Sequence, residues 1–307
     1  MINLIKKTVL YIKSPSLFFY KILSKLQSKY DLLAKSKDNK DLEAFNDREF
    51  KLNTPAMVEL KNGMKLWGDL GDYGVSRAAM FSTYEPSETN FFKKIIPSIS
   101  EGLIIDIGAN IGWFTLLFSQ FSREVIAIEP RPNNFEYLKK NRDSNNLSNV
   151  EIINAAVSDS EGEGIVFVLP SAGNSGGTHF KSDPSEEFIN ELRNKDYEIN
   201  KVPILLLDKI IGSRKVALIK IDIEGAEPYA IKGALNILKN SKPIILCEIN
   251  PICLRSNGNM EPEEFLSLMA SLNYEGFILN EDSSKGPKID RQWDFGNTWK
   301  NIIFQSK

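Results

Sequence analysis

A buried strand that runs into a glycine-containing turn constrains this chain more than any other feature. Residues 103–107 are apolar apart from Asp106, and Gly108-Ala109-Asn110-Ile111-Gly112 follows them directly. The next apolar run, residues 125–128, ends at Glu129. In α/β proteins such a turn lets the backbone approach a nucleoside, and the acid accepts hydrogen bonds from the ribose hydroxyls. The pattern therefore predicts an α/β fold with a nucleoside site.

The glycine spacing indicates which nucleoside is bound. A dinucleotide fingerprint that starts at Gly108 needs glycines at positions 110 and 113, where this chain has Asn110 and Trp113. The phosphate-binding pattern G-x-x-x-x-G-K-[ST] is absent from the sequence. A carboxylate at Asp106 is unfavourable beside phosphates but suits a ligand with an ammonium and a sulfonium group. These residues favour S-adenosylmethionine as the cofactor.

Strand and helix patterns alternate from residue 103 onward, which predicts a doubly wound, mostly parallel sheet. We expect strands at 103–107, 124–128, 150–154, 216–222, 244–248, 275–279 and 300–305, and helices at 111–121, 131–145, 184–195, 226–239 and 261–272. Residues 164–183 look irregular. Ligands of such sheets bind beyond the carboxyl ends of the strands. There we expect one crevice to collect the side chains of Asp106, Glu129, Asn154, Asp222 and Glu248.

If the methyl group of this cofactor is transferred to a hydroxyl, the hydroxyl must lose its proton, which requires a general base or a metal. His179, the only histidine, lies in a glycine-rich segment and has a suitable ordinary pKa, so it is one candidate base. Asp222 and Glu224, at the end of an apolar strand, are the other candidate catalytic residues. Glu248 and Asn250 follow the next strand and are expected to orient the acceptor. Mg²⁺ bound by Asp222, Glu248 and Asn250 is the less favoured alternative, and we predict no metal.

The composition indicates which binding partners and which cellular location to expect. The net charge of -2 provides no field that would attract nucleic acid. Cys247 and Cys253 do not form a metal-binding pattern, and no apolar run is long enough for a membrane span. We therefore expect a cytoplasmic enzyme whose acceptor is not nucleic acid. The buried Lys220 is expected to pair with Asp222, two residues further along the same strand.

Three regions are expected along the chain: a helical arm at 1–45, a β-hairpin and helix lead-in at 46–100, and the catalytic domain at 101–307. Residues 1–40 carry nine lysines against Asp31 and Asp38, with apolar residues at helical spacing. The arm either rests on an anionic membrane surface or packs on the core or a partner subunit. An Asn62-Gly63 turn between two alternating segments predicts the hairpin.

The chain resembles the FkbM family of S-adenosylmethionine-dependent methyltransferases. The resemblance runs from about residue 80 to 300, and its motifs are Tyr84-Glu85-Pro86, residues 105–115, residues 127–132, Ala155-Ala156-Val157-Ser158-Asp159, residues 207–211, residues 219–227, Lys232-Gly233-Ala234 and residues 243–248. It implies a class I methyltransferase fold, a Rossmann-like sheet of seven strands. The same motifs imply that Asp106, Gly108, Asn110, Gly112 and Glu129 hold the cofactor, and that Asp222 and Glu224 face its methionine end and the acceptor. Besides Asp222, the neighbouring residues Ala109, Asn154 and Ala155 are also expected to contact the cofactor.

The family also implies O-methylation of hydroxyl groups, often on sugars, glycans or related natural products. Trp113, Trp293 and Trp299 are candidates for stacking on a sugar. Two alternatives stay open: methylation of nucleic acid, and a cofactor-binding scaffold without catalysis. The Asp222-Ile223-Glu224-Gly225 segment lacks the Asp/Asn-Pro-Pro-Tyr pattern that amino-methylating enzymes often carry.

Overall fold

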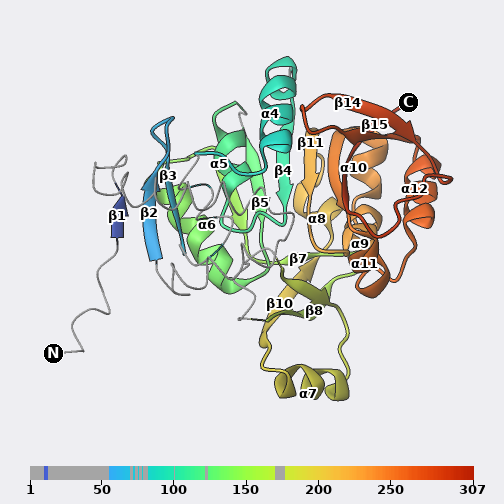
Figure 1. Ribbon diagram of the computed structural model, residues 1–307, viewed down its shortest axis with the longest axis horizontal. Helices are drawn as coiled ribbons and strands as arrows, with labels where there is room; N and C mark the ends of the chain where they lie inside the picture. Colours follow the sequence, from blue (N-terminus) through green and yellow to red (C-terminus); the bar gives the residue numbers. More distant parts are fainter. Residues whose placement is uncertain are drawn as a thin grey trace, which may run out of the picture.

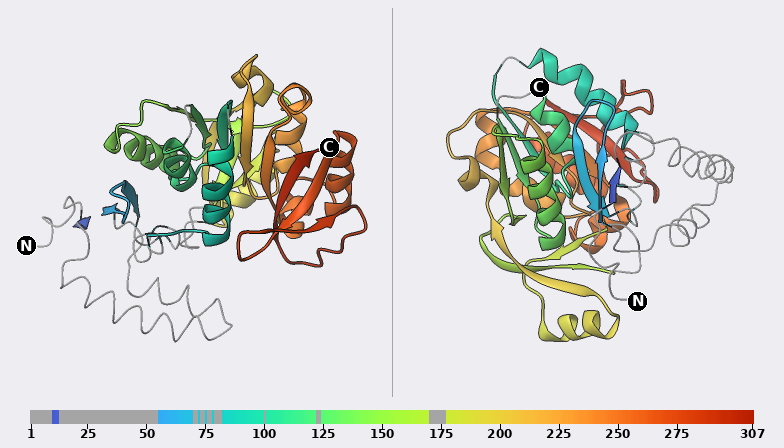
Figure 2. Two further views of the ribbon diagram at one scale, coloured as in Figure 1. Left: turned by 90° about the horizontal axis from the view of Figure 1, so that it is seen from above. Right: turned by 90° about the vertical axis from the view of Figure 1, so that its left-hand side faces the viewer.

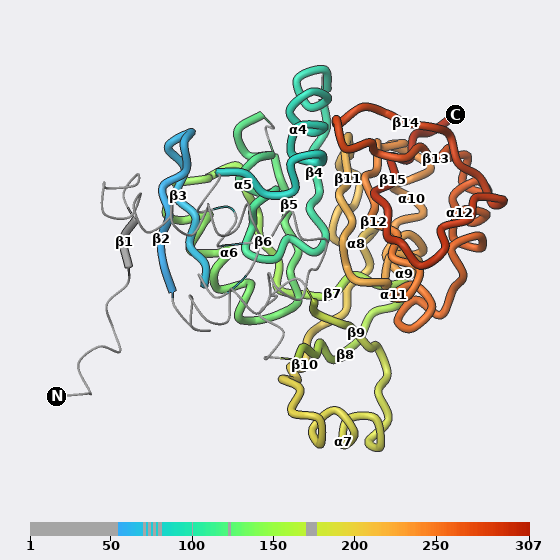
Figure 3. Tube along the Cα trace, viewed as in Figure 1, coloured from blue at the N-terminus to red at the C-terminus, as the bar shows by residue number. Residues whose placement is uncertain are grey.

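One large sheet forms the centre of the molecule in the computed structural model (Figure 1), which describes residues 10–12, 55–69, 72, 75, 78, 82–99, 101–121, 124–169 and 177–307. Its strands, in spatial order, are β14 (Lys285–Ile289), β13 (Tyr274–Leu279), β15 (Lys300–Ser306), β12 (Ile244–Ile249), β11 (Val216–Ile221), β4 (Leu103–Ile107), β5 (Val125–Ile128) and β6 (Val150–Ile153). Figure 3 follows the chain through this order, in which β4 lies between β11 and β5.

Five neighbouring strands, from β12 to β6, pair in parallel. β15 is antiparallel to both β12 and β13, and β14 is antiparallel to β13. The α/β class is as predicted, but the sheet has eight strands instead of seven. The additional strand, β14, was not predicted because Lys285-Gly286-Pro287-Lys288 is polar and contains glycine and proline. It occupies the sheet edge, where proline is tolerated.

Helices cover both faces of the sheet, which is why its strands are near-continuous apolar runs. One face packs against α4 (Pro86–Ile95), the 3₁₀ helix η1 (Ile96–Ser98) and α5 (Trp113–Ser119), using alternate residues such as Ile104, Leu218 and Leu246. The opposite face uses Ile105, Ile219 and Ile245. It packs against α8 (Leu207–Ile211), α9 (Glu227–Lys232), α10 (Leu235–Asn240), α11 (Pro251–Ser256) and α12 (Pro262–Ser271).

The single helix expected at 226–239 is two helices, α9 and α10, with Gly233 between them. A Cβ atom at Gly233 would lie 2.1 Å from the carbonyl oxygen of Ser158, so the backbone passes too close to its neighbour there for a side chain. No helix in the described part of the chain combines the length and the apolar character needed to cross a membrane.

The predicted hairpin is present as β2 (Pro55–Glu59) and β3 (Lys65–Asp69) around the Asn62-Gly63 turn. It packs on α6 (Pro132–Ser144), where the Asn141 side chain accepts a hydrogen bond from Trp67 N and donates one to Trp67 O. β1 (Leu10–Ile12) adds to the free edge of β2, although the arm was expected to be helical there. The rest of the predicted arm, including most of residues 1–45, lies outside the described residues.

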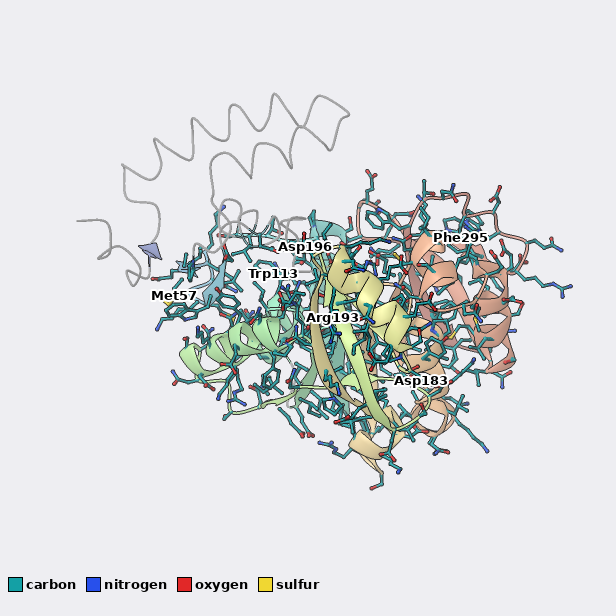
Figure 4. All side chains as sticks on the ribbon, turned by 90° about the horizontal axis from the view of Figure 1, so that it is seen from below. Met57, Trp113, Asp183, Arg193, Asp196 and Phe295 are labelled. Carbon is teal, nitrogen blue, oxygen red and sulfur yellow. The ribbon has the colours of Figure 1, made fainter. Side chains whose placement is uncertain are left out.

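A second sheet extends the molecule below the first, between β6 and β11 in the sequence (Figures 1 and 2). Its order is β7 (Ala156–Val157), β10 (Glu198–Leu205), β8 (Gly162–Val168) and β9 (His179–Lys181), and α7 (Glu186–Asn194) covers one face. We call these residues, 156–205, the inserted sheet. Figure 4 shows the molecule from this side, with α7 and its Arg193 nearest the viewer. Residues 164–183 were expected to be irregular, so the second sheet was not predicted.

Candidate functional site

A cavity lies over the carboxyl ends of β4, β5, β11 and β12, beside the central strand, where doubly wound sheets bind ligands. The cavity has a volume of about 240 Å³. The inserted sheet supplies part of its wall through Val166, Thr178 and Phe180. Its charged lining residues are Asp72, Glu85, Glu129, Asp222, Glu224, Glu248 and Lys220. Six carboxyl groups therefore face a single ammonium among the described residues.

The predicted glycine turn forms the floor of this cavity. Gly108 has a φ of +77°, and a Cβ atom there would lie 1.9 Å from the carbonyl oxygen of Asp222. Only glycine allows the turn to pack this closely on the end of β11. Asn110 follows with a φ of +52°, a strained value for a residue with a side chain. The turn is thus held in one shape by its contact with β11.

Glu129 lies at the end of β5 and is 4% exposed. Its Oε2 accepts a hydrogen bond from the backbone N–H of Asn110 (2.8 Å), and its Oε1 accepts one from Arg131 N (2.9 Å). Burial raises the pKa of this carboxyl to about 7, although both backbone hydrogen bonds oppose the rise. The sequence placed Glu129 at a ribose-binding position, and the structure places it in the cavity wall beside the glycine turn.

A row of buried charges supports the cavity on the α5 side of the sheet. Asp106 and Lys220 are register partners on β4 and β11, so their side chains share a face. The Lys220 ammonium lies 3.0 Å from Asp222 Oδ2 and 4.8 Å from the centre of the Phe114 ring. Burial lowers the pKa of Lys220, but the surrounding carboxylates outweigh burial and raise the pKa overall. The predicted Lys220–Asp222 pair is confirmed.

Two further carboxyls face Asp222 across the cavity. Burial and the nearby Asp222 raise the pKa of Glu85 to about 8 and that of Glu248 to about 9. Glu85 has a left-handed backbone with a φ of 42°, a conformation that few non-glycine residues adopt. Strained residues persist where the surrounding structure fixes them, often at functional sites. A positive charge entering this group would relieve the repulsion between the carboxylates.

Glu224 lies in the turn between β11 and α9 and lines the cavity. Its φ is +53°, and burial followed by the charge of Asp222 raises the pKa of its carboxyl to about 7. The thiol of Cys253 donates to Glu224 Oε2 over 3.6 Å. Burial raises the pKa of this thiol to about 12, so Cys253 stays protonated and remains a donor.

Several predicted site residues do not line the cavity. Asp106 is fully buried beneath it and accepts a hydrogen bond from Thr115 Oγ1 (2.6 Å), while its Oδ1 has no hydrogen-bond partner among the described residues. Asn154 donates to Glu129 O (2.8 Å) and Pro130 O (3.0 Å). Asn250 caps α11 by accepting from Ile252 N and Cys253 N. Gly112 precedes α5 with a φ of 95°. These four residues contribute to the shape of the site from below or beside it.

His179 also lies outside the cavity wall. The segment expected to be a loop is the strand β9, and neighbouring residues on a strand face opposite ways. Thr178 and Phe180 therefore line the cavity, whereas the His179 ring packs on Phe167 with centroids 5.5 Å apart. Burial lowers the pKa of the imidazole. The structure does not bring His179 to the group of carboxyls.

Other cavity residues were not expected from the sequence. Tyr84 and Glu85 were noted only as a motif, and Asp72, Thr178 and Phe180 were not singled out. The three tryptophans expected to stack on a sugar lie in different environments: Trp113 lines the cavity, Trp293 packs against the core, and Trp299 is 57% exposed. Ala109 and Ala155 line the cavity where the motifs placed them.

Among the described residues there is no group of three or more histidine, cysteine, aspartate or glutamate side chains with the geometry to hold a metal ion. The alternative Mg²⁺ set fails at Asn250, because its side-chain oxygen is engaged with the backbone of α11.

A parallel sheet in this order, with an acid-lined cavity over its strand ends, defines a doubly wound ligand-binding domain. Residues 106–277 match the family model of the methyltransferase FkbM domain, which covers more than half of the chain. The chain belongs to the FkbM methyltransferase family.

Three named proteins have similar sequences, each 26% identical. Methyltransferase 1 of Beauveria bassiana aligns over 45% of this chain and 61% of its own length, so the chain spans under two thirds of that relative. Methyltransferase sdnD of Sordaria araneosa aligns over 59% of this chain and 76% of its own length. Hexuronic acid methyltransferase AglP of Haloferax volcanii aligns over 59% and 68%, respectively.

Solved structures with a similar fold include methyltransferase FkbM from Methylobacillus flagellatus KT, with 16% identity and a TM-score of 0.41 over 76% of this chain and 53% of that chain. A TehB-like SAM-dependent methyltransferase from Corynebacterium glutamicum has 12% identity and a TM-score of 0.39 over 72% and 88%, respectively. The family assignment rests on the family model and not on these structural scores.

Proposed function

We propose that this protein is an S-adenosylmethionine-dependent O-methyltransferase that methylates a hydroxyl group of a sugar, glycan or glycoconjugate. The observation that carries the proposal is the composition of the cavity, in which Glu129 lies beside the glycine turn and Glu85, Asp222, Glu224 and Glu248 surround one lysine. This donor set fits a nucleoside that bears a positive charge. Phosphate-rich cofactors need the opposite electrostatic surroundings.

The roles follow from position in the cavity. Glu129 would accept hydrogen bonds from the ribose hydroxyls, and the backbone of residues 108–111 would pack on the adenosyl group. Asp222 and Glu85 would face the charged methionine end. When bound, S-adenosylmethionine supplies an activated methyl group on a positively charged sulfur, so the protein's main tasks are to position the acceptor and to accept its proton.

Glu224 is the proposed general base. It lines the cavity, and its pKa of about 7 allows it to hold or accept a proton near neutral pH. Asp222 is less suited to this role because it is paired with Lys220 at 3.0 Å. Glu248, with a pKa of about 9, would be protonated at neutral pH and would donate a hydrogen bond to an acceptor hydroxyl.

The wall from the inserted sheet is apolar where it meets the cavity. Phe180 and Val166 would pack against the C–H face of a sugar, a surface that suits aromatic rings. AglP is named for hexuronic acid, but in this cavity a carboxylate would be repelled by Glu224, which must be ionised to act as the base. We therefore expect the sugar ring that enters the cavity to be uncharged.

The proposal is tested by incubating the protein with S-adenosylmethionine labelled in the methyl group. The acceptor panel contains neutral oligosaccharides, uronic acids, nucleotide sugars, glycolipids and RNA, and mass spectrometry locates the label. Label on a hydroxyl of a neutral saccharide is expected. Label on a nucleic-acid base would contradict the acceptor class, and tight cofactor binding with no transfer to any acceptor would favour the scaffold alternative.

A further inference from the structure

The backbone of Glu224 is fixed by contacts on three sides. Glu227 Oε1 accepts hydrogen bonds from the N–H groups of Ile223 (3.1 Å) and Gly225 (3.2 Å), which flank Glu224. The backbone of this turn also packs closely against α11 and the residues after it. A Cβ atom at Gly225 would lie 2.1 Å from Cys253 O, and one at Gly258 would lie 2.4 Å from Gly225 O. The turn and the C-terminal end of α11 therefore form one packed unit.

Asn257, which ends α11, makes the third contact. Its Nδ2 donates to the carbonyl oxygen of Glu224 over 2.6 Å, and the same nitrogen lies 2.9 Å from His179 Nδ1. A carbonyl oxygen can only accept, so the amide must present its NH₂ group there, and that NH₂ group can only donate to His179. Nδ1 is therefore the acceptor, and the proton of the neutral ring is on Nε2.

His179 belongs to the inserted sheet, whereas Glu224 belongs to the main sheet. The side chain of Asn257 joins them through two hydrogen bonds, and the Phe167 ring holds the imidazole from the inserted side. The same strand, β9, follows Thr178 in the cavity wall and includes Phe180. A shift of this wall would thus move His179, to which Asn257 is hydrogen-bonded.

We propose that His179 is a positioning residue: through Asn257 it fixes the strained turn of Glu224 and couples the wall of the inserted sheet to the carboxyl in the cavity. His179 does not itself take the acceptor's proton. The catalytic consequence rests on the proposed methyl transfer, whereas the hydrogen-bond link exists independently of it. The two parts are tested by different measurements.

The link is tested by NMR, since His179 is the only histidine in the chain and gives a single set of imidazole signals. In ¹⁵N-labelled protein the ring nitrogens should report an unprotonated Nδ1 and a protonated Nε2. Asn257→Ala should remove the hydrogen bond to Nδ1 and shift the ¹⁵N resonance of that nitrogen, and Asn190→Ala, an exposed asparagine on α7, should leave the resonance unchanged. A protonated Nδ1 in the neutral ring of the unmodified protein would overturn the link, whatever the enzyme's activity.

The role is tested with two substitutions. In His179→Asn the side-chain oxygen replaces Nδ1 as the acceptor, whereas His179→Ala removes it. We expect His179→Ala to lower kcat for methyl transfer about tenfold with little change in KM for the cofactor, and His179→Asn to restore most of the loss. Equal loss in both variants would identify His179 as the base itself, and full activity of His179→Ala would show that it positions nothing.

Discussion

The ammonium of Lys220 lies 3.0 Å from Asp222 Oδ2, and the two residues are separated by one position on the same strand end. Lys220 is buried, with the Phe114 ring 4.8 Å away and Asp106 as its partner on β4. It is the one cation among the charged residues that the structure describes in the cavity wall. Lys220 therefore supplies the positive charge next to Asp222 in a cavity that otherwise carries carboxyl groups.

Lys220→Met tests this arrangement. The substitution keeps most of the length of the side chain but leaves the partly buried Asp222 and the fully buried Asp106 without their counter-charge. Breaking a buried pair in this way destabilises a protein by about 3 kcal/mol or more. Urea unfolding measures the loss. The matched control is Lys195→Met on α7, where the exposed pair with Glu191 should contribute nothing measurable. A stable Lys220→Met protein would contradict the account of the buried charges.

Gly108→Ala tests the contact between the glycine turn and β11. Both Gly108 (φ +77°) and Gly63 (φ +81°) have left-handed backbones, but a Cβ atom at Gly63 would meet nothing within 4 Å. Gly63→Ala should cost about 1 kcal/mol of stability from its backbone alone. Gly108→Ala must also displace the carbonyl of Asp222, and we expect a loss of roughly 3 kcal/mol together with weaker cofactor binding. Equal thermal shifts for the two variants would mean that the close approach is not required.

Cofactor binding should release protons. The pKa of Glu85, which would face the charged methionine end, is raised to about 8, so this carboxyl holds its proton near pH 7. A nearby positive charge favours the ionised carboxylate and lowers its pKa. Affinity for S-adenosylmethionine should therefore rise from pH 6 to 7.5. Calorimetry in buffers of different ionisation enthalpy measures the protons released.

S-adenosylhomocysteine is the control ligand for this measurement, because its sulfur is uncharged. It should release fewer protons than S-adenosylmethionine in the same buffers. Glu85→Gln should also reduce the number, since the amide has no proton to lose. Equal proton release by both ligands would show that the charge on sulfur does not act on Glu85.

Glu224→Gln should separate binding from chemistry. The amide retains the size of the side chain but cannot accept a proton, so kcat should fall about 100-fold or more. The affinity for the cofactor should change little, because Asp222 and Glu129 remain. Rates are measured with the acceptor that the labelling experiment identifies. If Glu224→Gln retains full kcat, proton removal belongs to another residue, with Asp222 next in order.

The central sheet and the cavity wall formed by the glycine turn and Glu129 were predictable from local sequence. Strands such as 103–107 and 244–248 are continuous apolar runs, which occur where both faces are covered. Gly108 and Glu129 were also found from local patterns, because each follows such a run directly. Asp222 and Glu248 followed from the rule that parallel strands end at one edge of the sheet.

The cavity wall formed by the inserted sheet and by Glu85 was not predictable in the same way. The inserted sheet pairs residues that are far apart in the sequence, such as Val166 and Asn200, and its strands contain glycine, proline and many polar residues. His179 was assigned to a loop from its glycine-rich surroundings, and on strand β9 it faces away from the cavity. Glu85 precedes the main domain by many residues and reaches the site only through the packing of α4 on the sheet. Tertiary contacts decided these positions.

Titration calorimetry with S-adenosylmethionine, NAD⁺ and the Glu129→Gln variant tests the central claim most directly. The account predicts that one S-adenosylmethionine binds per chain, that NAD⁺ does not bind, and that Glu129→Gln weakens S-adenosylmethionine binding at least tenfold without unfolding the protein. Binding of NAD⁺ in preference to S-adenosylmethionine, or an unchanged affinity in Glu129→Gln, would contradict it.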